Sequence, residues 1–406
     1  MHKRIMHLAG LFAACVMLAS FTVAAPTPSY AADPTSTPAP SAPDYGKYTV
    51  LSTTELDLGA GPVSRHAHIS PDGTLFAYGD AKQLCIYTIA GDMQTCSDLI
   101  VNELPVRLDN DSVVWSPDSS KLAFTSDFLL TFRNPGTWVM DAKTGKIIKT
   151  TGIGFERASI LKDDNLVVDL APKWLPDSQH MVFLRYYQIK GKRTGPFVNV
   201  LDVPSGNIKE YENLVSESIS IYLTGISSDG TLLAFNNDGR GSKIEGGLWL
   251  YNLNKNTFKK LYGISKTEET PRVMSFSADS EQILISNYTD GTADPTFKPE
   301  DSPIRLVDVA TGKLLLVDSE KYVRRAGWAP TGKAIAYIVY NAITPDINGL
   351  YIATEPGKPG KMILPGFFIV PTSREGQPIL WAANDTLLVS DRDRGFKLTV
   401  VKLGVK

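Results

Sequence analysis

Short apolar runs separated by polar turns fill most of the chain, and they are grouped into a unit that occurs seven times. Each unit has an apolar residue, often Trp, then a turn of the type Ser-Pro-Asp-Gly, and then an apolar run. The leading apolar residues are Ile69, Trp115, Trp174, Ile226, Phe276, Trp328 and Trp381. A repeat of about fifty residues that holds only strand-sized runs is typical of a propeller blade. The pattern therefore predicts an all-β, seven-bladed β-propeller.

A second turn, later in the unit, completes the predicted blade. Asp141–Gly145, Asp202–Gly206 and Asp308–Gly312 each follow a strand-like run, and Asn252–Asn256 is a degraded copy. In the first turn Pro presets φ, while Asp or Asn and then Gly accept the conformations that close a hairpin. Strands a and b therefore flank the first turn, and strands c and d flank the second. This arrangement predicts four-stranded antiparallel blades.

The two ends of the repeat predict how the ring closes. The last unit contains the runs ILWAA, TLLVS and FKLTVVKL but no fourth strand. The segment from Tyr48 to Leu58 precedes the first unit and has no blade of its own. We expect this segment to supply the outer strand d of the last blade. A ring closed in this way has no open seam for pairing with another chain, so we expect a monomer.

The repeat also resembles that of a known family. Runs such as VVWSPDSSKLAFTSD, TWVMDAKTGK and LLVSDRDRGFKLTVV resemble the WD-like repeat of TolB-like propellers, which also builds the propellers of prolyl oligopeptidases. The resemblance covers about residues 46 to 406 and implies blade geometry, not an activity. The α/β domain that precedes the propeller in TolB and the peptidase domain of the oligopeptidases are both missing from the pattern. The partners and the activity of those relatives are therefore not implied.

The N-terminal residues have the features of an export signal. A short basic start precedes a mostly apolar run from about Leu8 to Ala25, and small residues offer cleavage after Ala24 or Ala31. A proline directly after the first site would hinder cleavage there, so we predict a signal peptide over residues 1–31. The run is also long enough to span a bilayer, which leaves an uncleaved anchor as the alternative. It continues past Cys15, which argues against a lipidated cysteine.

The rest of the chain divides into two parts. Residues 32–45 form a linker rich in Pro, Ser and Thr that cannot bury a core. Residues 46–406 form the predicted propeller. We expect the mature protein to be periplasmic or extracellular, with no membrane span of its own.

Two cysteines, Cys85 and Cys96, remain in the predicted mature chain. They lie in the strand-like runs QLCIYTI and QTCSDL on either side of Ala90-Gly91. A hairpin with a two-residue loop there pairs residue 89 with residue 92, and therefore Cys85 with Cys96. Export permits oxidation, so we predict a disulfide between strands c and d of the first blade. Two buried free thiols are the alternative.

Composition and motifs narrow the possible chemistry. The chain has 41 Lys and Arg residues against 43 Asp and Glu residues, so no nucleic-acid partner is expected. No G-x-S-x-G elbow or Walker-type loop is present in the sequence. His66 and His68 are the best candidate metal ligands, but zinc needs three or four ligands and no Cys/His cluster supplies the rest. The acidic loop Thr289–Asp301 lacks the ligand spacing of known Ca²⁺ loops. We therefore expect no metal and no cofactor.

Arginines recur at one position of the repeat, four residues before the leading apolar residue. The seven residues at this position are Arg65, Asp111, Leu170, Tyr222, Arg272, Arg324 and Gln377. They stand at the entry of strand a, which rings one mouth of the central channel, on the face where the b–c loops open. Converging guanidinium groups can hold a carboxylate or phosphate by forked hydrogen bonds. The candidate ligand-binding residues are Arg65, His66, Arg272 and Arg324. The alternative is that each Arg pairs with a nearby Asp or caps carbonyl groups.

Two functions compete at this point. One is an exported, non-enzymatic scaffold that presents a funnel-shaped face to a protein, peptide or glycan. The other is a lyase or hydrolase that acts on an acidic saccharide at the channel mouth, which requires several titratable groups close together. One histidine pair and a set of arginines favour the scaffold, and no residue stands out as catalytic.

Overall fold

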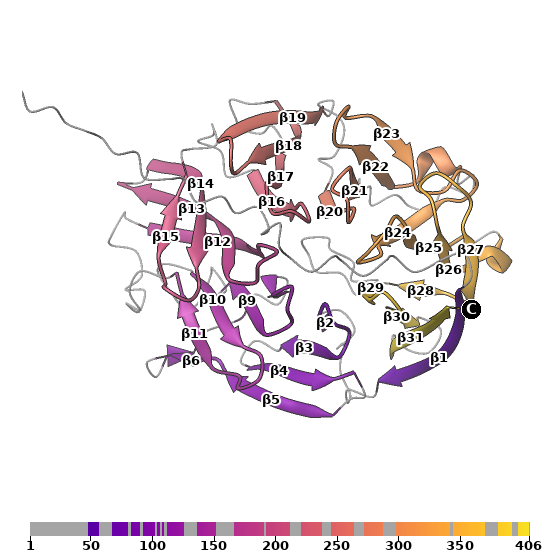
Figure 1. Cartoon of the computed structure of the whole chain (residues 1–406), viewed down its shortest axis with the longest axis horizontal. Helices are drawn as coiled ribbons and strands as arrows, with labels where there is room; N and C mark the ends of the chain where they lie inside the picture. Colours follow the sequence, from indigo (N-terminus) through magenta and orange to yellow (C-terminus); the bar gives the residue numbers. More distant parts are fainter. Residues whose placement is uncertain are drawn as a thin grey trace, which may run out of the picture.

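Seven β-sheets form a ring around a central axis, and each sheet is one blade (Figure 1). The computed structural model describes residues 48–56, 67–79, 83–89, 92–101, 104–105, 108, 112–125, 136–151, 166–190, 192–211, 221–237, 245–263, 272–286, 298–341, 344–369, 381–391 and 397–405. Strand a of each blade lies nearest the axis, and strand d lies on the outer rim. This is the seven-bladed propeller that the repeats predict. The predicted signal peptide and linker lie outside the described residues.

The strands follow one another from the axis outwards in blades 1 to 6. Blade 1 contains β2 (Ala67–Ile69), β3 (Leu75–Gly79), β4 (Gln83–Thr88) and β5 (Met93–Asp98). Blade 2 contains β8 (Val114–Trp115), β9 (Lys121–Thr125), β10 (Thr137–Asp141) and β11 (Ile147–Thr150). Blade 3 contains β12 (Leu166–Trp174), β13 (His180–Ile189), β14 (Lys192–Asp202) and β15 (Ile208–Glu210). Between blades 1 and 2 lies a short hairpin of β6 (Ile100–Val101) and β7 (Leu104–Pro105).

The second half of the ring repeats the same order. Blade 4 contains β16 (Ile221–Ile226), β17 (Leu232–Asn237), β18 (Gly247–Asn252) and β19 (Thr257–Gly263). Blade 5 contains β20 (Arg272–Phe276), β21 (Gln282–Ser286), β22 (Ile304–Asp308) and β23 (Leu314–Leu316). Blade 6 contains β24 (Val323–Trp328), β25 (Ile335–Val339), β26 (Gly349–Ala353) and β27 (Lys361–Pro365). Blade 7 contains β29 (Trp381–Ala383), β30 (Thr386–Asp391), β31 (Lys397–Val405) and β1 (Tyr48–Leu56), and β28 (Phe368–Ile369) pairs with the far end of β30.

Strand β1 supplies the outer strand of blade 7 and closes the ring, as predicted. It pairs antiparallel with β31, from Tyr48 opposite Val405 to Leu56 opposite Leu398. A β-bulge at Leu51 shifts this register, and the Leu51 side chain is 70% exposed. A bulge bends an edge strand and makes it a poorer template for pairing with another chain. Residues 57–58 of the predicted segment lie outside the described residues.

The turn between strands a and b is built by its own polar side chains. In blade 1, Asp72 Oδ1 accepts hydrogen bonds from the Ser70 hydroxyl at 2.5 Å and from the Thr74 backbone N–H at 3.1 Å. Gly73 has a φ of +69°, in the left-handed region that favours glycine. In three other blades a serine adopts this conformation: Ser119 (φ 60°), Ser178 (φ 56°) and Ser280 (φ 61°).

These three serines also link each turn to that of the preceding blade. Their Oγ atoms accept backbone N–H groups across the blade boundary: Ser119 from Asp72 (3.1 Å), Ser178 from Asp118 (2.9 Å) and Ser280 from Ser228 (3.0 Å). A left-handed backbone costs a serine more than a glycine. The hydrogen bond to the neighbouring blade offsets that cost, so the a–b turns help to hold adjacent blades together.

The tryptophans of the repeat pack between blades. Three of them donate the indole N–H to a strand a carbonyl of the preceding blade: Trp115 to His68 (2.8 Å), Trp174 to Val114 (3.2 Å) and Trp381 to Gly327 (3.0 Å). Trp328 is buried too, but its indole N–H has no acceptor among the described residues. Apolar side chains fill the same seams. Between blades 6 and 7, for example, Ile338 and Leu350 pack in one cluster with Val389 and Val401.

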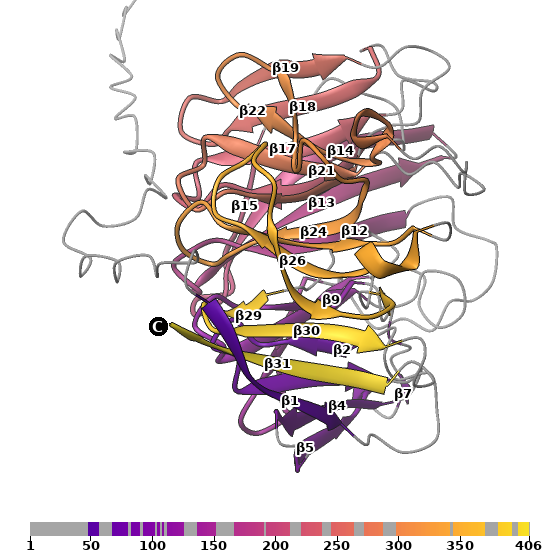
Figure 2. The same ribbon diagram turned by 90° about the vertical axis from the view of Figure 1, so that its right-hand side faces the viewer.

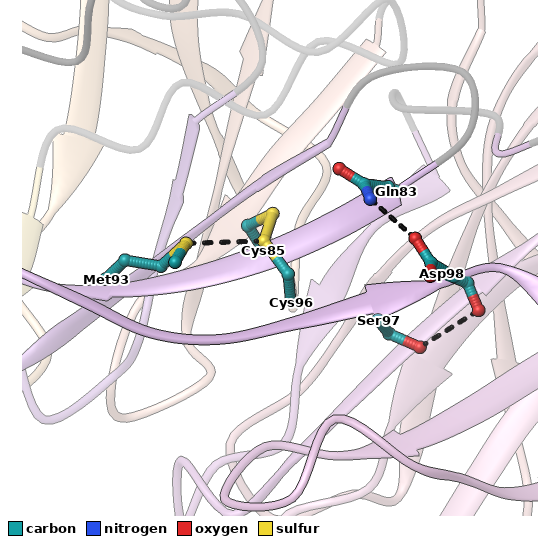
Figure 3. The surroundings of a disulfide bond; sticks show 6 residues. All are labelled: Gln83, Cys85, Met93, Cys96, Ser97 and Asp98. Carbon is teal, nitrogen blue, oxygen red and sulfur yellow. Dashed lines mark hydrogen bonds between the residues drawn. A yellow bond between two sulfur atoms is a disulfide. The ribbon is translucent and has the colours of Figure 1, made fainter.

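Cys85 and Cys96 face each other across β4 and β5 and form the predicted disulfide, with a Cα–Cα distance of 4.0 Å (Figure 3). The Met93 sulfur lies 3.5 Å from the Cys96 sulfur. Nearer the turn the register shifts by one residue, so that Tyr87 pairs with Met93. The expected pairing of residue 89 with residue 92 is therefore wrong. A bulge adds one residue to β5, and the shift lies on the turn side of the cysteines, so their pairing is unaffected.

Candidate functional site

The two ends of the propeller differ in the connections that they carry. The a–b and c–d turns lie at one end, which we call the a–b face, and the b–c connections lie at the other, the b–c face. In Figure 2, β30 runs from the a–b face at the left to the b–c face at the right. Five of the seven a–b connections are five residues long, whereas the b–c connections range from two residues in blade 3 to 17 in blade 5. Variable connections on a rigid scaffold are typical of a binding face.

The structure describes only part of the predicted arginine set. Arg65, His66 and the side chain of Arg272 lie outside the described residues. The backbone of Arg272 begins β20 and pairs with Ser286, the last residue of β21. Arg324 is the second residue of β24. Two of the predicted positions are thus at the b–c end of strand a in adjacent blades, and the convergence of all four side chains stays a prediction.

Arg324 occupies a β-bulge at the entry of β24. Val323 pairs with Val339, and Arg325 pairs with Ile338, so Arg324 is the extra residue between them. Bulges interrupt the alternation of side chains and often aim one of them at a site. Neither Arg324 nor Arg325 is buried.

The guanidinium of Arg324 lies over the ring of Tyr340, which in turn contacts Phe367. Its central carbon lies 5.1 Å from the ring centroid of Tyr340, and the Tyr340 ring lies 4.2 Å from that of Phe367 at an angle of 49°. A guanidinium over an aromatic face gains a cation–π interaction and keeps its N–H edge available for hydrogen bonds. In the part of the chain that the structure describes, no carboxylate forms an ion pair with Arg324. The described residues therefore do not support the alternative in which Arg324 pairs with a nearby Asp.

The b–c connection of blade 6 holds Tyr340 in place. Tyr340 directly follows β25, and the next backbone N–H, that of Asn341, donates to Asn348 Oδ1 at 2.6 Å. Asn341 Oδ1 in turn accepts the Thr344 N–H at 3.0 Å. A short 3₁₀ helix, η5 (Pro345–Ile347), lies between these two asparagines. The connection therefore positions the aromatic ring by hydrogen bonds within itself.

Blade 3 carries a charged pair at the same end of the propeller that sequence reasoning missed. Arg185 on β13 donates two hydrogen bonds to Asp169 on β12, at 2.7 Å and 2.8 Å, and both side chains are buried. Burial opposes the charged form of Arg185, but the hydrogen bonds and charge of Asp169 outweigh it and raise its pKa. A forked pair of this kind is held by both partners. Arg185 is therefore part of the framework and is not available to a ligand.

The histidines do not assemble into a metal site in the described structure. His68 is buried in β2, where its backbone carbonyl accepts the indole N–H of Trp115. His180 lies at the a–b face, and its Nδ1 is 2.6 Å from Asp177 Oδ2. That hydrogen bond raises the pKa of His180. Among the described residues, no three His, Cys, Asp or Glu side chains are close enough together to hold one metal ion.

Aspartates of the a–b turns have structural roles. The Asp118 carboxylate accepts the Ser116 hydroxyl at 2.6 Å and the Ser120 backbone N–H at 3.0 Å, as expected for turn chemistry. From the acidic loop, η4 (Pro299–Asp301) is described, and the Pro299 carbonyl accepts a hydrogen bond from Arg305 at 3.0 Å. The preceding residues of that loop lie outside the described residues.

Two of the site residues, Tyr340 and Phe367, are not among the residues that the repeat predicts. Tyr340 directly follows strand b, so a search for aromatic residues at that position would have found it. Phe367 precedes β28, which has no counterpart in the other blades as far as the structure describes them. The repeat places the entry of strand a in blade 7 at Gln377, yet Phe368 and Ile369 already pair with the far end of β30. Gln377 itself lies outside the described residues, so its place at the entry of strand a stays a prediction.

Comparison with known proteins finds a likeness in fold but assigns no activity. No protein-family model matches the sequence, and no curated protein is significantly similar to it. Among solved structures, an oligogalacturonate lyase in complex with manganese matches with a TM-score of 0.51 and 12% identity, over 88% of this chain and 96% of that chain. At this identity the likeness concerns the fold alone.

TolB proteins are also among the matching structures. TolB from Acinetobacter baumannii has a TM-score of 0.39 and 15% identity, over 84% of this chain and 64% of that chain. A putative TolB from Agrobacterium tumefaciens has a TM-score of 0.40 and 13% identity, over 66% of this chain and 88% of that chain. This chain thus spans less than two thirds of the length of the Acinetobacter protein. The fold itself is the seven-bladed propeller that the repeats predict. None of the described residues belongs to a helix long and apolar enough to cross a bilayer.

Proposed function

We propose that this protein is an exported, non-enzymatic binding scaffold whose b–c face receives a protein, peptide or glycan ligand. The contrast between the two faces carries the proposal. The a–b face is built from nearly uniform turns whose polar groups bond to one another, whereas the b–c connections at the other end vary in length. A rigid ring with one variable face suits recognition by shape and scattered polar groups.

Export follows in this proposal from the N-terminal sequence. The signal-like residues 1–31 and the linker at 32–45 precede the propeller, and the disulfide of blade 1 is a bond that persists in an oxidising compartment. The mature protein would then be periplasmic or extracellular. We further propose that it is a monomer, because β1 pairs the end of the ring with its beginning.

A lyase or hydrolase acting on an acidic saccharide is the second candidate. The likeness in fold to an oligogalacturonate lyase that binds manganese keeps this candidate in view. Several described titratable groups favour the scaffold instead, because they are engaged in the framework: Asp169 with Arg185, His180 with Asp177, and the turn aspartates with their own loops. Such groups are not placed to act as acid and base on one substrate.

A binding and turnover screen separates the two candidates. Mature protein, residues 32–406, would be applied to arrays of peptides and glycans with and without EDTA, and in parallel incubated with acidic polysaccharides. A scaffold is expected to bind at least one ligand, to be insensitive to EDTA and to leave the ligand intact. Unsaturated or newly reducing saccharide ends, lost on adding EDTA, would instead establish the enzyme. No binding to any ligand class would contradict the scaffold.

A further inference from the structure

We propose that Arg324, Tyr340 and Phe367 form a subsite for an acidic peptide segment, in which a Glu or Asp carboxylate binds the guanidinium and a neighbouring apolar side chain packs on Phe367. This inference rests on the proposed binding function and names the class of ligand. It is carried by one cation and two aromatic rings that lie at the boundary of blades 6 and 7 on the b–c face.

The Arg324 guanidinium has the geometry to bind an anion. The Arg324 guanidinium lies over the Tyr340 ring, and its five N–H donors form a planar fork with an outward edge. A carboxylate matches this edge with two parallel hydrogen bonds. Arg185 shows the contrast within the same chain, since Asp169 already fills its fork and burial encloses the pair. Arg324 is only partly buried, and no ion pair with a described carboxylate competes for it.

The aromatic pair gives the subsite an apolar surface beside its charge. Tyr340 and Phe367 are both partly exposed, and their ring centroids are 4.2 Å apart. The cation and the apolar surface are thus within reach of two adjacent side chains of one peptide. Arg and Tyr are also the residues most often found at the energetic centres of protein interfaces. A segment that pairs an acidic residue with an aliphatic or aromatic one fits both parts.

The polar groups around the subsite favour a peptide over a saccharide. A sugar presents many hydroxyl groups, which need several free donors and acceptors. The nearest asparagines on this connection already hold the loop, Asn341 Oδ1 by accepting from Thr344 and Asn348 Oδ1 by accepting from Asn341. The described residues offer a positive charge and an apolar surface. An acidic peptide with an apolar side chain matches both.

The test compares variants that lose the same charge on opposite faces. A library of 12-residue peptides would be screened on the mature protein, on Arg324→Gln, and on Lys333→Gln, which removes an exposed cation from the a–b face. Binders of the parent are expected to be enriched in Glu or Asp next to an aliphatic or aromatic residue. Arg324→Gln should weaken them about tenfold or more, with Lys333→Gln unchanged. Thermal melting by circular dichroism checks that all variants are folded.

Two further variants separate geometry from charge. Arg324→Lys keeps the charge without the planar fork, so intermediate binding is expected. Phe367→Ala should weaken binders with an apolar neighbour more than those without one. The same proteins are then titrated with a galacturonate oligosaccharide. Equal loss in Arg324→Gln and Lys333→Gln, or binders without acidic enrichment, would overturn the subsite while leaving the scaffold function. Arg324-dependent binding of the saccharide but of no peptide would overturn the ligand class. A protein that binds nothing on either array would contradict the proposed function as well.

Discussion

The a–b face and the b–c face are made by the same strands, yet they distribute their polar groups in opposite ways. On the a–b face, Ser, Asp and backbone groups bond to one another within a turn and across blade boundaries, as Ser178 does with Asp118. On the b–c face, Arg324 rests on an aromatic ring and has no described carboxylate partner. The comparison shows that one face of a propeller can stabilise the fold while the sequence of the other face is free to vary. It predicts that substitutions on the two faces have different consequences.

The largest expected effect is the loss of a tryptophan at the a–b face. Trp381 is 8% exposed and donates its indole N–H to the Gly327 carbonyl of blade 6. We expect Trp381→Ala to lower the free energy of unfolding by about 3–5 kcal/mol, because it creates a cavity between two blades. The measurement is urea-induced unfolding followed by circular dichroism.

A matched substitution on the other face sharpens this result. Tyr340→Ala removes an aromatic ring that is only partly buried, so its cost should not exceed about 2 kcal/mol. Equal destabilisation by Trp381→Ala and Tyr340→Ala would break the contrast between the faces.

A smaller effect is expected at the link between blades 2 and 3. Ser178→Ala keeps the left-handed backbone but loses the acceptor for the Asp118 N–H, which should cost about 1–2 kcal/mol. Ser178→Gly loses the same hydrogen bond but relieves the backbone, so its cost should be lower by up to about 1 kcal/mol. Both are read from urea midpoints. Identical stability of the serine, alanine and glycine forms would show that the link contributes nothing.

The smallest expected effect is a dependence on pH. Burial opposes the charged form of Asp118, but the hydrogen bonds from Ser116 and Ser120 outweigh it and lower its pKa. A carboxyl group with a lowered folded pKa adds stability that is fully present above the unfolded pKa near 4 and is lost as the pH falls through the folded pKa. The stability difference between the parent and Asp118→Asn should therefore shrink as the pH falls below about 4. A difference that grows on acidification would contradict this assignment.

The fold was within reach of the sequence because each blade repeats the same local instructions. The turn residues, the leading tryptophans and the unmatched segment from Tyr48 to Leu58 predict the blades and their closure without long-range information. The bulges were not within reach. One extra residue in β5 shifts the pairing next to Met93. Another extra residue, in β12, shifts the register with β13 between the a–b turn and the Asp169–Arg185 pair. Counting residues back from a turn fails at such points, because the side-chain period of a strand is two residues.

The candidate site could be predicted only in part for a related reason. Arg324 stands at a fixed position of the repeat, so the sequence predicts where it lies in the blade. The contact of Tyr340 with Phe367 depends on how blades 6 and 7 meet, and on β28, which is found in blade 7 alone among the described strands. Contacts between units depend on irregular connections, which the repeat does not describe.

The ring closure also decides how the protein can be attached to anything else. Tyr48 pairs with Val405, and its hydroxyl donates to the Asn384 carbonyl in the a–b turn of blade 7 at 3.0 Å. The described chain therefore enters and leaves the propeller at the same end, opposite the b–c face. A tag, a fusion partner or a solid support joined before Tyr48 or after Val405 departs from the a–b face. Immobilised through either terminus, the molecule would hold its variable connections and Arg324 outwards, towards the solution.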